Sequence, residues 1–445
     1  MAIVEKLGLP YTRSTMNMRG ILPDGSLIPP EKVVDFATRA FGTFFGWLPT
    51  VSQGGEAVPT ESESVADRMF SEGSPLYGDG DSEPSEEDIE MAKSGARAFQ
   101  GWTGAPLDYV SLKWWSFGQD TSGGDAVLVE GYRPFIQWLT TTVERLGAII
   151  ALNSPVTEVI TDEEEGVSMR VSPEDESRGK VDYKAAYAVL TLPLGVLKYN
   201  PPTFSPPLPI RRLQSIERLG SGLLDKIVLI YDSAWWAKQD EDGTEGADGA
   251  TTEATVSILF PSKEDPTRLM GPSRGLPSED HIQLPGAFPV RSPEYLRKNP
   301  NTLMIFNVHA QGGIPALAIF MGGEWGDRME PCSEEQTKEW ADKVVKEYFG
   351  KSHLQSIPSP TQVLRTTWRA DKYAHGSYSY IPIANKDTKT EGGSPIDQLE
   401  LSHTLWGRLF WAGEHTELDQ FASVHGAWSS GIREAEKVLV KLEDA

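Results

Sequence analysis

The residues best suited to chemistry lie in the last fifty positions of the chain. The apolar run LFW at 409–411 leads into AGEHT at 412–416, and ASVHGA follows at 422–427. The carboxylate of Glu414 thus follows a short predicted strand, and a helix rich in small residues begins near Ser423. The first turn of a helix has unpaired N–H groups and partial positive charge, so it can face an anion or an electron-rich ring. The same pattern also fits an ordinary strand, loop and helix that close an α/β domain.

Two further stretches carry candidate groups. Lys226 opens an apolar predicted strand at 226–231, where a lysine is ordinarily a solvent-facing end residue. If Lys226 were buried instead, desolvation would disfavour its charge, and it could donate a hydrogen bond or relay a proton near neutral pH. Trp368 and Tyr378 lie in an aromatic, turn-rich stretch at 367–380, and on composition alone they are core side chains.

Composition describes a globular chain long enough for two domains, with 445 residues of which 39% are hydrophobic. The 41 basic and 64 acidic residues give a net charge of −23, which disfavours nucleic acid as a partner. A charge of this sign would favour a cationic ligand, although an acidic balance more often reflects solubility. Much of this charge lies in acidic stretches, which are predicted to be solvated or disordered insertions. These stretches are 61–90, 162–165 and 239–253.

Several classes of site and location are disfavoured by the residues that the sequence lacks. One cysteine, Cys332, excludes an intrachain disulfide and a multi-cysteine metal site, and the seven histidines have no metal-ligand spacing. We therefore predict no metal. No apolar run approaches the length of a membrane span, and the first residues are unlike a signal peptide. We therefore expect no membrane span and an intracellular, cytoplasmic location.

The C-terminal motif resembles that of a known family. F-x-A-G-E-H-T followed by A-S-V-H-G-A-x-x-S-G-x-R-E-A is similar to the flavin motif of the FAD-dependent amine oxidases, which include polyamine oxidases, monoamine oxidases and flavin histone demethylases. The resemblance implies FAD as cofactor. It places Gly413 and Glu414 beside the ribityl or ribose hydroxyls of the flavin, and Ser423 and Val424 beside the isoalloxazine ring.

The resemblance also assigns roles outside the C-terminal motif. In GLLDKIVL at 222–229, Lys226 matches the lysine that holds a water against flavin N5. Val156 matches a position that meets adenine through its backbone. Trp368 matches an indole that packs on the flavin, and Tyr378 matches one wall of an aromatic substrate cage. Lys226, Tyr378 and Trp368 would therefore be the catalytic residues.

Two residues differ from those of the monoamine oxidases and indicate which members of the family the chain resembles more. Ser377 stands where monoamine oxidases have the cysteine that bonds the flavin, so the resemblance implies noncovalent FAD. Ser423 stands where they have the second cage tyrosine, so Tyr378 and Ser423 would form a one-sided cage with room for a longer or branched amine. The stretch 51–90 is acidic and aperiodic, unlike the heptad insertion of the demethylases, which favours a polyamine oxidase.

The largest departure is the lack of a dinucleotide-binding turn. Such a turn needs G-x-G-x-x-G between a strand and a helix, because only glycine lets backbone N–H groups reach the pyrophosphate. The motif occurs nowhere, and the resemblance begins near Met1 after the first βαβ unit of the family. Either the sequence is an N-terminally incomplete version of such an enzyme, or it is a remnant with another role.

These observations predict an α/β fold with α+β elements, similar to the two-domain fold of the amine oxidases. The flavin domain would be an incomplete Rossmann-type domain, and the substrate domain would contain a mixed sheet. Strands are predicted at 148–152, 156–161, 167–171 and 183–192. The predicted segments are 1–126 and 207–399 for the substrate domain, and 127–206 and 400–445 for the flavin domain.

The reaction implied by the resemblance is oxidation of an amine to an imine. A hydride would pass from the carbon next to nitrogen to flavin N5, and O2 would then be reduced to hydrogen peroxide. The partners would be a small cationic amine, with a polyamine favoured, and O2. A histone-demethylase-like oxidase is one alternative. A flavin-free protein that keeps the shell of the fold for binding or scaffolding is another.

Overall fold

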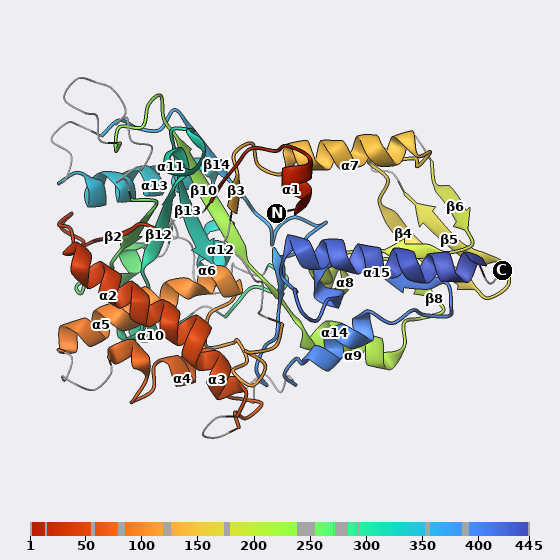
Figure 1. The fold of residues 1–445 in the computed structure, drawn as a ribbon, viewed down its shortest axis with the longest axis horizontal. Helices are drawn as coiled ribbons and strands as arrows, with labels where there is room; N and C mark the ends of the chain where they lie inside the picture. Colours follow the sequence, from red (N-terminus) through yellow and green to blue (C-terminus); the bar gives the residue numbers. More distant parts are fainter. Residues whose placement is uncertain are drawn as a thin grey trace.

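The computed structural model describes most of the chain (Figure 1). The described residues are 2–13, 16–54, 58–78, 85–118, 126–172, 179–237, 254–269, 271, 284–289, 291, 293–351, 357–384 and 391–443. The strands are β1 (Tyr11–Arg13), β2 (Met18–Ile21), β3 (Ala126–Leu128), β4 (Val156–Asp162), β5 (Gly166–Val171), β6 (Val181–Ala185), β7 (Ala188–Leu190), β8 (Thr203–Ser205), β9 (Gly220–Gly222), β10 (Leu224–Ile230), β11 (Val256–Leu259), β12 (Leu303–Asn307), β13 (Ala316–Gly322), β14 (Gln362–Arg365), β15 (Tyr378–Tyr380) and β16 (Leu409–Trp411).

Helices cover both faces of the larger sheet and flank the smaller ones. They are α1 (Ala2–Lys6), α2 (Pro30–Phe41), α3 (Leu48–Ser52), α4 (Val65–Met69), α5 (Glu86–Ala96), α6 (Gln100–Thr103), α7 (Arg133–Arg145), α8 (Leu194–Tyr199), α9 (Ile210–Arg218), α10 (Pro293–Lys298), α11 (Val308–Gly312), α12 (Glu324–Met329), α13 (Glu334–Phe349), α14 (Pro395–Leu401) and α15 (Val424–Glu443). None of the helices in the described part of the chain has the length and apolar character that a membrane span requires.

A six-stranded sheet organises one half of the molecule, in the order β14-β10-β13-β12-β11-β2. Its pairs are antiparallel except β11 with β2. Along β10 the side chains alternate, because successive residues of a strand point to opposite faces. Asp225, Ile227 and Leu229 are buried, whereas Lys226 is exposed. The predicted apolar strand at 226–231 is therefore confirmed.

Helical segments form an aromatic core on one face of this sheet. In α2, Val33, Phe36, Ala37 and Ala40 are buried at helical spacing, and Pro30 begins the helix. A π-helical turn, Gly42–Trp47, continues it and places Phe44 in the same core. The helix predicted at 31–47 is thus confirmed. On the opposite face, α13 begins at a capping box between Ser333 and Gln336, as the sequence predicted.

The acidic stretch at 61–90 is more ordered than its composition indicated. Within its described part, Ser64 caps α4, and the side chains of Val65 and Met69 are completely buried. Leu76 is also completely buried. The prediction of a solvated insertion is therefore wrong here, because apolar residues between the acidic ones reach the core. The stretch 162–165 forms an exposed turn between β4 and β5, and the whole of 239–253 lies outside the described residues.

The other half contains two smaller sheets. One is a four-stranded sheet in the order β6-β5-β4-β8, and the other is the parallel pair β16 and β7. The strand predicted at 183–192 is divided into β6 and β7, because its two ends belong to different sheets. The strand predicted at 148–152 is wrong: those residues form no strand with any described part of the chain, and their side chains are exposed. The strands predicted at 156–161 and 167–171 are confirmed.

Candidate functional site

Tyr378 is held from two sides at the start of β15. This strand pairs antiparallel with β9, which places Tyr378 opposite Gly222. The Tyr378 hydroxyl donates a 2.7 Å hydrogen bond to the carbonyl oxygen of Gly101. A Cβ added at Gly104 would lie 2.6 Å from the ring, so the glycine permits this close packing. Desolvation, with the nearby charge of Glu414, raises the pKa of Tyr378, and the ring is a fixed, neutral phenol.

Ser377 is bound to the backbone at the junction of β9 and β10. Its amide donates to the carbonyl oxygen of Gly222 at 2.8 Å, and its hydroxyl accepts from the amide of Leu224 at 2.8 Å. The hydroxyl therefore joins β15 to the start of the strand that carries Lys226. The noncovalent attachment of FAD, which was inferred from Ser377, stays a prediction.

Lys226 lies on the face of the sheet that also carries Phe320, its partner on β13, and Met304 of the aromatic core. Its amide donates to the Thr366 hydroxyl at 2.9 Å, and its carbonyl accepts from the Thr366 amide at 3.0 Å. The ammonium lies 5.2 Å from the centre of the Phe320 ring, a cation–π distance. Partial desolvation lowers the pKa of Lys226, and the charge of Asp225 opposes this shift. Lys226 is exposed, so it is not the buried lysine whose charge desolvation would strongly disfavour. Its role toward the flavin stays a prediction.

Trp368 is connected to Lys226 through Asp225. The carboxylate of Asp225 accepts hydrogen bonds from the Trp368 amide at 3.2 Å and from the Thr366 hydroxyl at 2.7 Å. Asp225 and Lys226 are neighbours in β10, so their side chains point to opposite faces. Asp225 therefore fixes the Trp368 loop from the buried side. The Trp368 indole is exposed, so the expectation from composition that it is a core side chain is wrong.

Buried carboxyl groups and a buried guanidinium lie beneath this loop. Arg369 Nε lies 3.0 Å from Asp327 Oδ1, and Glu330 accepts from the amides of Arg369 and Ala370, both at 2.7 Å. Desolvation raises the pKa of Asp225, Asp327 and Glu330. Because two neighbouring carboxylates do not both ionise in a dry site, we predict that one of Asp225 and Glu330 holds a proton at neutral pH. Sequence reasoning missed this cluster, whose members lie in distant segments with no common motif.

Glu414 is partly buried and bound by protein groups. One carboxylate oxygen accepts from the Ser379 amide at 3.1 Å, and the other accepts from the Ser379 hydroxyl at 2.7 Å and the Ala422 amide at 2.6 Å. Burial raises the pKa of Glu414, and these hydrogen bonds oppose the shift. Ala422 has a φ of 59°, which is uncommon outside glycine. Glu414 thus stabilises a strained turn just before α15.

The start of α15 is capped by Ser423. Its hydroxyl accepts a 3.0 Å hydrogen bond from the amide of Gly426, three residues later, and donates to the carbonyl of Gln420. Val424 is the first residue of the helix, and its side chain is exposed. The helix predicted to begin near Ser423 is therefore confirmed. A Cβ on Gly426 would lie 2.1 Å from the carbonyl oxygen of Gln420, so glycine is required for the tight approach of the loop.

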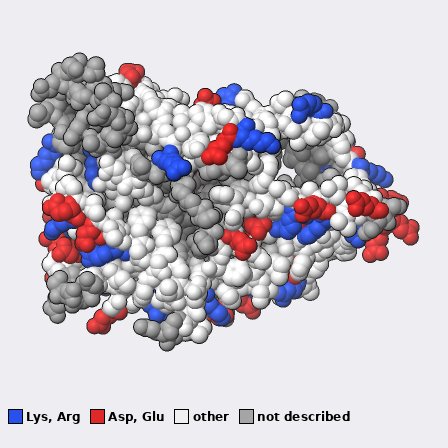
Figure 2. All heavy atoms as spheres, viewed as in Figure 1, with Lys and Arg blue, Asp and Glu red and all other residues white. Residues whose placement is uncertain are grey.

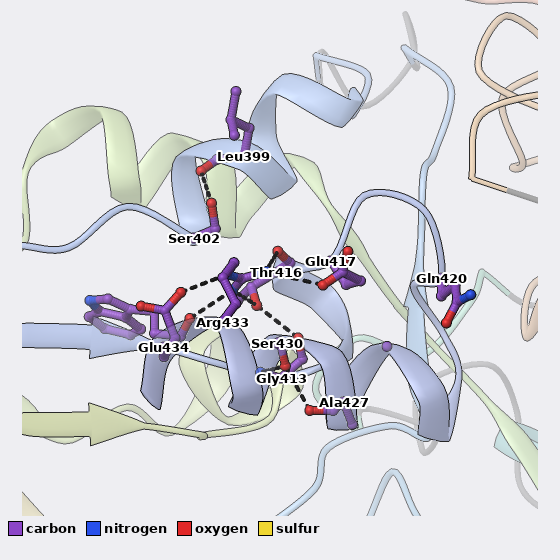
Figure 3. Close-up of polar contacts among 12 residues, drawn as sticks. Leu399, Ser402, Gly413, Thr416, Glu417, Gln420, Ala427, Ser430, Arg433 and Glu434 are labelled. Carbon is purple, nitrogen blue, oxygen red and sulfur yellow. Dashed lines mark hydrogen bonds and ion pairs between the residues drawn. The ribbon is translucent and has the colours of Figure 1, made fainter. Parts of the chain in front are cut away.

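Polar contacts along its inner face hold α15 in register (Figure 3). The amide of Gly413 donates to the Ser430 hydroxyl at 2.9 Å. Arg433 donates to the carbonyls of Trp411 and Thr416, at 3.1 and 3.0 Å, and pairs with Glu434 at 2.6 Å. The sequence motif contains Gly413, Ser430 and Arg433, but it did not indicate that they join β16 to the final helix.

A cavity of about 300 Å³ opens beside the start of α15. Ala422 and Ser423 line it on one side, with Ser379 of β15. Its aromatic lining comes chiefly from Phe44, Phe45, Trp102, Trp114, Trp115 and Phe421. None of the described lining residues carries a charge. A neutral aromatic cavity can hold a flat ring by stacking, or a single ammonium group by cation–π contacts.

The structure brings together only some of the predicted site residues. Ser423 lines the cavity, and Glu414 and Gly413 support the turn and helix beside it. Tyr378 precedes Ser379 in β15, but its side chain points to the opposite face and it is not among the residues that line the cavity. Lys226 and Trp368 form a second group around Asp225. Val156 lies apart at the start of β4, opposite Val171, where it packs against the core of the smaller sheets.

Comparison with known proteins identifies the class to which this fold and site belong. The family described as flavin containing amine oxidoreductase matches residues 60–439. The chain therefore belongs to this flavin-dependent family.

The chain is similar to particular members at low identity. Polyamine oxidase 5 of Oryza sativa subsp. japonica is 28% identical over 337 residues, which are 76% of this chain and 53% of that protein. Lysine-specific histone demethylase 1 homolog 2 of Arabidopsis thaliana is 29% identical over 263 residues, which are 59% of this chain and 28% of that protein. The chain spans about half the length of the polyamine oxidase relatives that it matches.

Among solved structures, the fold matches a double mutant of putrescine oxidase, from a structure-based redesign of its cofactor binding. The TM-score is 0.60 at 15% identity, and the match covers 98% of this chain and 85% of that chain. This likeness confirms the amine oxidase fold that the sequence predicted. The four segments assigned to a substrate and a flavin domain stay predictions.

The described residues fit one end of FAD better than the other. The aromatic cavity beside Ser423 and the bare first turn of α15 suit a flat ring. The pyrophosphate needs a turn of glycines between a strand and a helix, and the sequence has no G-x-G-x-x-G. The cavity therefore has the shape and aromatic lining that a flat ring requires, whereas the given sequence contains no glycine-rich turn for the pyrophosphate.

Proposed function

We propose that the chain takes part in FAD-dependent oxidation of an amine, with a polyamine-like substrate favoured. The observation that supports this best is the aromatic cavity at the start of α15, where Ser423 and Ala422 carry the family motif. Family membership supports flavin chemistry, and relatives named polyamine oxidases support the substrate class. When bound, FAD would accept a hydride from the carbon next to nitrogen, and O2 would take up the two electrons with protons to give hydrogen peroxide.

The residues of the chain would bind and orient the substrate. Tyr378 is a fixed, neutral ring and would form one wall of the cage, while Ser423 would leave the other wall open to a longer amine. Lys226, whose pKa is lowered by partial desolvation, would donate a hydrogen bond toward the flavin through a water. Trp368, which is held by Asp225, would pack on the flavin. FAD would be bound noncovalently, since Ser377 has no thiol.

The experiment is a substrate panel with the purified chain in excess FAD. Peroxide release and bleaching of the flavin absorbance would be measured with spermine, N-acetylspermine and benzylamine. We expect the polyamines to be oxidised faster than benzylamine. A large preference for benzylamine would contradict the one-sided cage. Absence of flavin absorbance after removal of free FAD would instead favour a flavin-free binding protein.

A further inference from the structure

The short strand β9 determines where β15 lies beside the cavity. Within the described part of the chain, β9 pairs with β15 alone, and Ser221 lies opposite Ser379. Ser379 is one of the residues that line the cavity, and Tyr378 precedes it in the strand. The other edge of β9 has no strand partner among these residues, so its backbone groups need hydrogen-bond partners of another kind.

Two cationic side chains bind the outer edge of β9. Lys198, near the end of α8, donates to the carbonyl oxygen of Leu219 at 2.7 Å, directly before the strand. Arg369 Nη1 donates to the carbonyl oxygen of Ser221 at 2.9 Å. Because carbonyl groups alternate in direction along a strand, these two carbonyls, which are two residues apart, point to the same edge. The two cations thus take the place of a neighbouring strand.

Lys198 directs all three of its N–H donors to the backbone. Besides Leu219, it donates to the carbonyl oxygens of Ile216 at 2.8 Å and Glu217 at 2.6 Å, in the last turn of α9. The last carbonyls of a helix have no partner within it, and a cation is favourable there. On the face shown in Figure 2, lysine and arginine side chains lie at the surface, several of them beside acidic ones. Lys198 instead joins the end of α9 to the start of β9.

Arg369 is fixed by buried partners of its own. Its side chain is completely buried, and Nε lies 3.0 Å from Asp327 Oδ1. Its backbone amide donates to the carboxylate of Glu330 at 2.7 Å. A guanidinium is a rigid planar fork, so one nitrogen binds Asp327 while another binds the carbonyl of Ser221. Arg369 therefore ties β9 to the buried carboxyl cluster.

From β9 the contacts continue to the wall of the cavity. The amide and hydroxyl of Ser379 donate to the carboxylate of Glu414, at 3.1 and 2.7 Å. Glu414 also accepts from the amide of Ala422, which lines the cavity together with Ser379. A shift of β9 would therefore displace Ser379 and, through Glu414, the turn that precedes α15.

We propose that Lys198 and Arg369 are positioning residues that hold β9 in place. Through β9 they fix Tyr378 and Ser379 of β15 beside the cavity. Neither cation is among the residues that line the cavity, so both act through the two strands. The consequence for ligand binding rests on the proposed function, because it takes the cavity as the site of the flavin ring.

The first measurement is amide hydrogen exchange of the ligand-free chain, which needs neither flavin nor amine. Lys198→Met keeps much of the length of the side chain and removes the three donors. We expect the amides of Ser377 and Ser379 to exchange at least about tenfold faster in this variant, because the β9–β15 pair opens more easily. Lys198→Arg should restore slow exchange, since a guanidinium can also donate to these carbonyls.

Two further variants separate positioning from a general loss of stability. Lys437→Met is the matched control, because Lys437 also donates to a backbone carbonyl, that of Ser402 at 3.1 Å, after the end of α14. It should leave exchange in β15 unchanged. Arg369→Lys keeps a charge beside Asp327 but has one nitrogen in place of the fork, so it should speed exchange in β15 as Lys198→Met does. A cooperative urea transition would show that each variant is folded.

The second measurement is binding of lumiflavin, which has the isoalloxazine ring with a methyl group in place of the ribityl chain. Its affinity would be followed by quenching of its fluorescence. We expect Lys198→Met to weaken binding at least about fivefold, because a binding site needs its walls held to within a fraction of an ångström. Lys198→Arg should restore the affinity, and Lys437→Met should leave it unchanged. If the unsubstituted chain did not bind lumiflavin, the proposed function would be contradicted, and the exchange rates would still decide the roles of Lys198 and Arg369.

Two results would overturn the proposal. One is faster exchange in Lys198→Met that is confined to α9 and leaves β15 as it is in the unsubstituted chain, because Lys198 would then only cap a helix. The other is exchange in β15 that Lys437→Met accelerates as much as Lys198→Met, because the effect would then reflect stability in general.

Discussion

The raised pKa of Glu330 should make the stability of the protein depend on pH. Desolvation and the neighbouring Asp225 raise the pKa of Glu330 to about 9 from an ordinary value of 4.5. The native state therefore binds this proton more tightly than the unfolded state does. Its contribution to stability is fully present below the unfolded pKa and decreases as pH rises toward the folded pKa.

The perturbation is Glu330→Gln, which keeps the shape of the side chain and removes its titration. One proton taken up on folding changes the free energy of unfolding by up to about 1.4 kcal/mol per pH unit. Between pH 6 and 9 the largest possible change in the free energy of unfolding would be about 4 kcal/mol, and structural relaxation and the entry of water reduce this change. We therefore expect the unsubstituted protein to lose about 1–3 kcal/mol relative to Glu330→Gln over this range.

The assay is urea unfolding at pH 6, 7.5 and 9, followed by tryptophan fluorescence and circular dichroism. Glu294→Gln is a suitable control, because it removes an exposed carboxylate that pairs with Lys298 on α10. The control should follow the unsubstituted protein at every pH. If Glu330→Gln also stayed parallel to the unsubstituted protein, Asp225 and Glu330 would not share a proton and the reasoning would be wrong.

Three further outcomes are expected. Lys226→Met retains much of the length of the side chain and removes the hydrogen-bond donor. It should slow turnover or flavin reoxidation about 10²-fold with little change in the urea midpoint. Unchanged turnover of the flavin-loaded protein would instead assign Lys226 a surface role. The 445-residue chain should bind FAD about 10³- to 10⁴-fold more weakly than a complete dinucleotide site, because three absent charge-assisted hydrogen bonds remove about 5 kcal/mol of binding free energy. Tight binding in a fluorescence titration would refute this prediction. Acid precipitation should release any bound flavin into the supernatant, since the attachment is predicted to be noncovalent. Gly195→Ala should lower stability by more than about 2 kcal/mol, because its Cβ would lie 2.3 Å from the carbonyl oxygens of Ala374 and His375; Gly46→Ala, where no atom lies within 4 Å, is the control for the same melting measurement.

Local patterns predicted many of the elements. The apolar spacing of α2 and the capping box of α13 depend on neighbours in sequence, and both helices were predicted. The strand at 148–152 was not correctly predicted, because a run of apolar residues indicates strand material whether or not a partner strand is present. The same limit applies to α15. Its sequence contains apolar residues at helical spacing, but it does not show whether they face the core or the solvent.

The candidate site was predictable where a motif carries it. Glu414, Gly413 and Ser423 were found from the C-terminal motif, although the hydrogen bonds of Glu414 to Ser379 and Ala422 were not. The cluster of Asp225, Asp327, Glu330 and Arg369 had no sequence signal, since its members meet only through the folding of distant segments. The cavity could not be predicted from the sequence either, because its aromatic wall comes from residues that composition assigns to the core.

The origin of the cavity walls sets when the cavity can form during synthesis. Phe44, Phe45 and Trp115 come from the first third of the chain, whereas Ser379 and Ser423 come from its last seventy residues. A ribosome-bound chain therefore presents these aromatic residues long before the opposite wall has emerged. Until then these rings face the surroundings, and chains at this stage can associate through them. The cavity is thus one of the last features to be completed. Truncation before α15 should therefore leave an exposed aromatic surface through which chains associate.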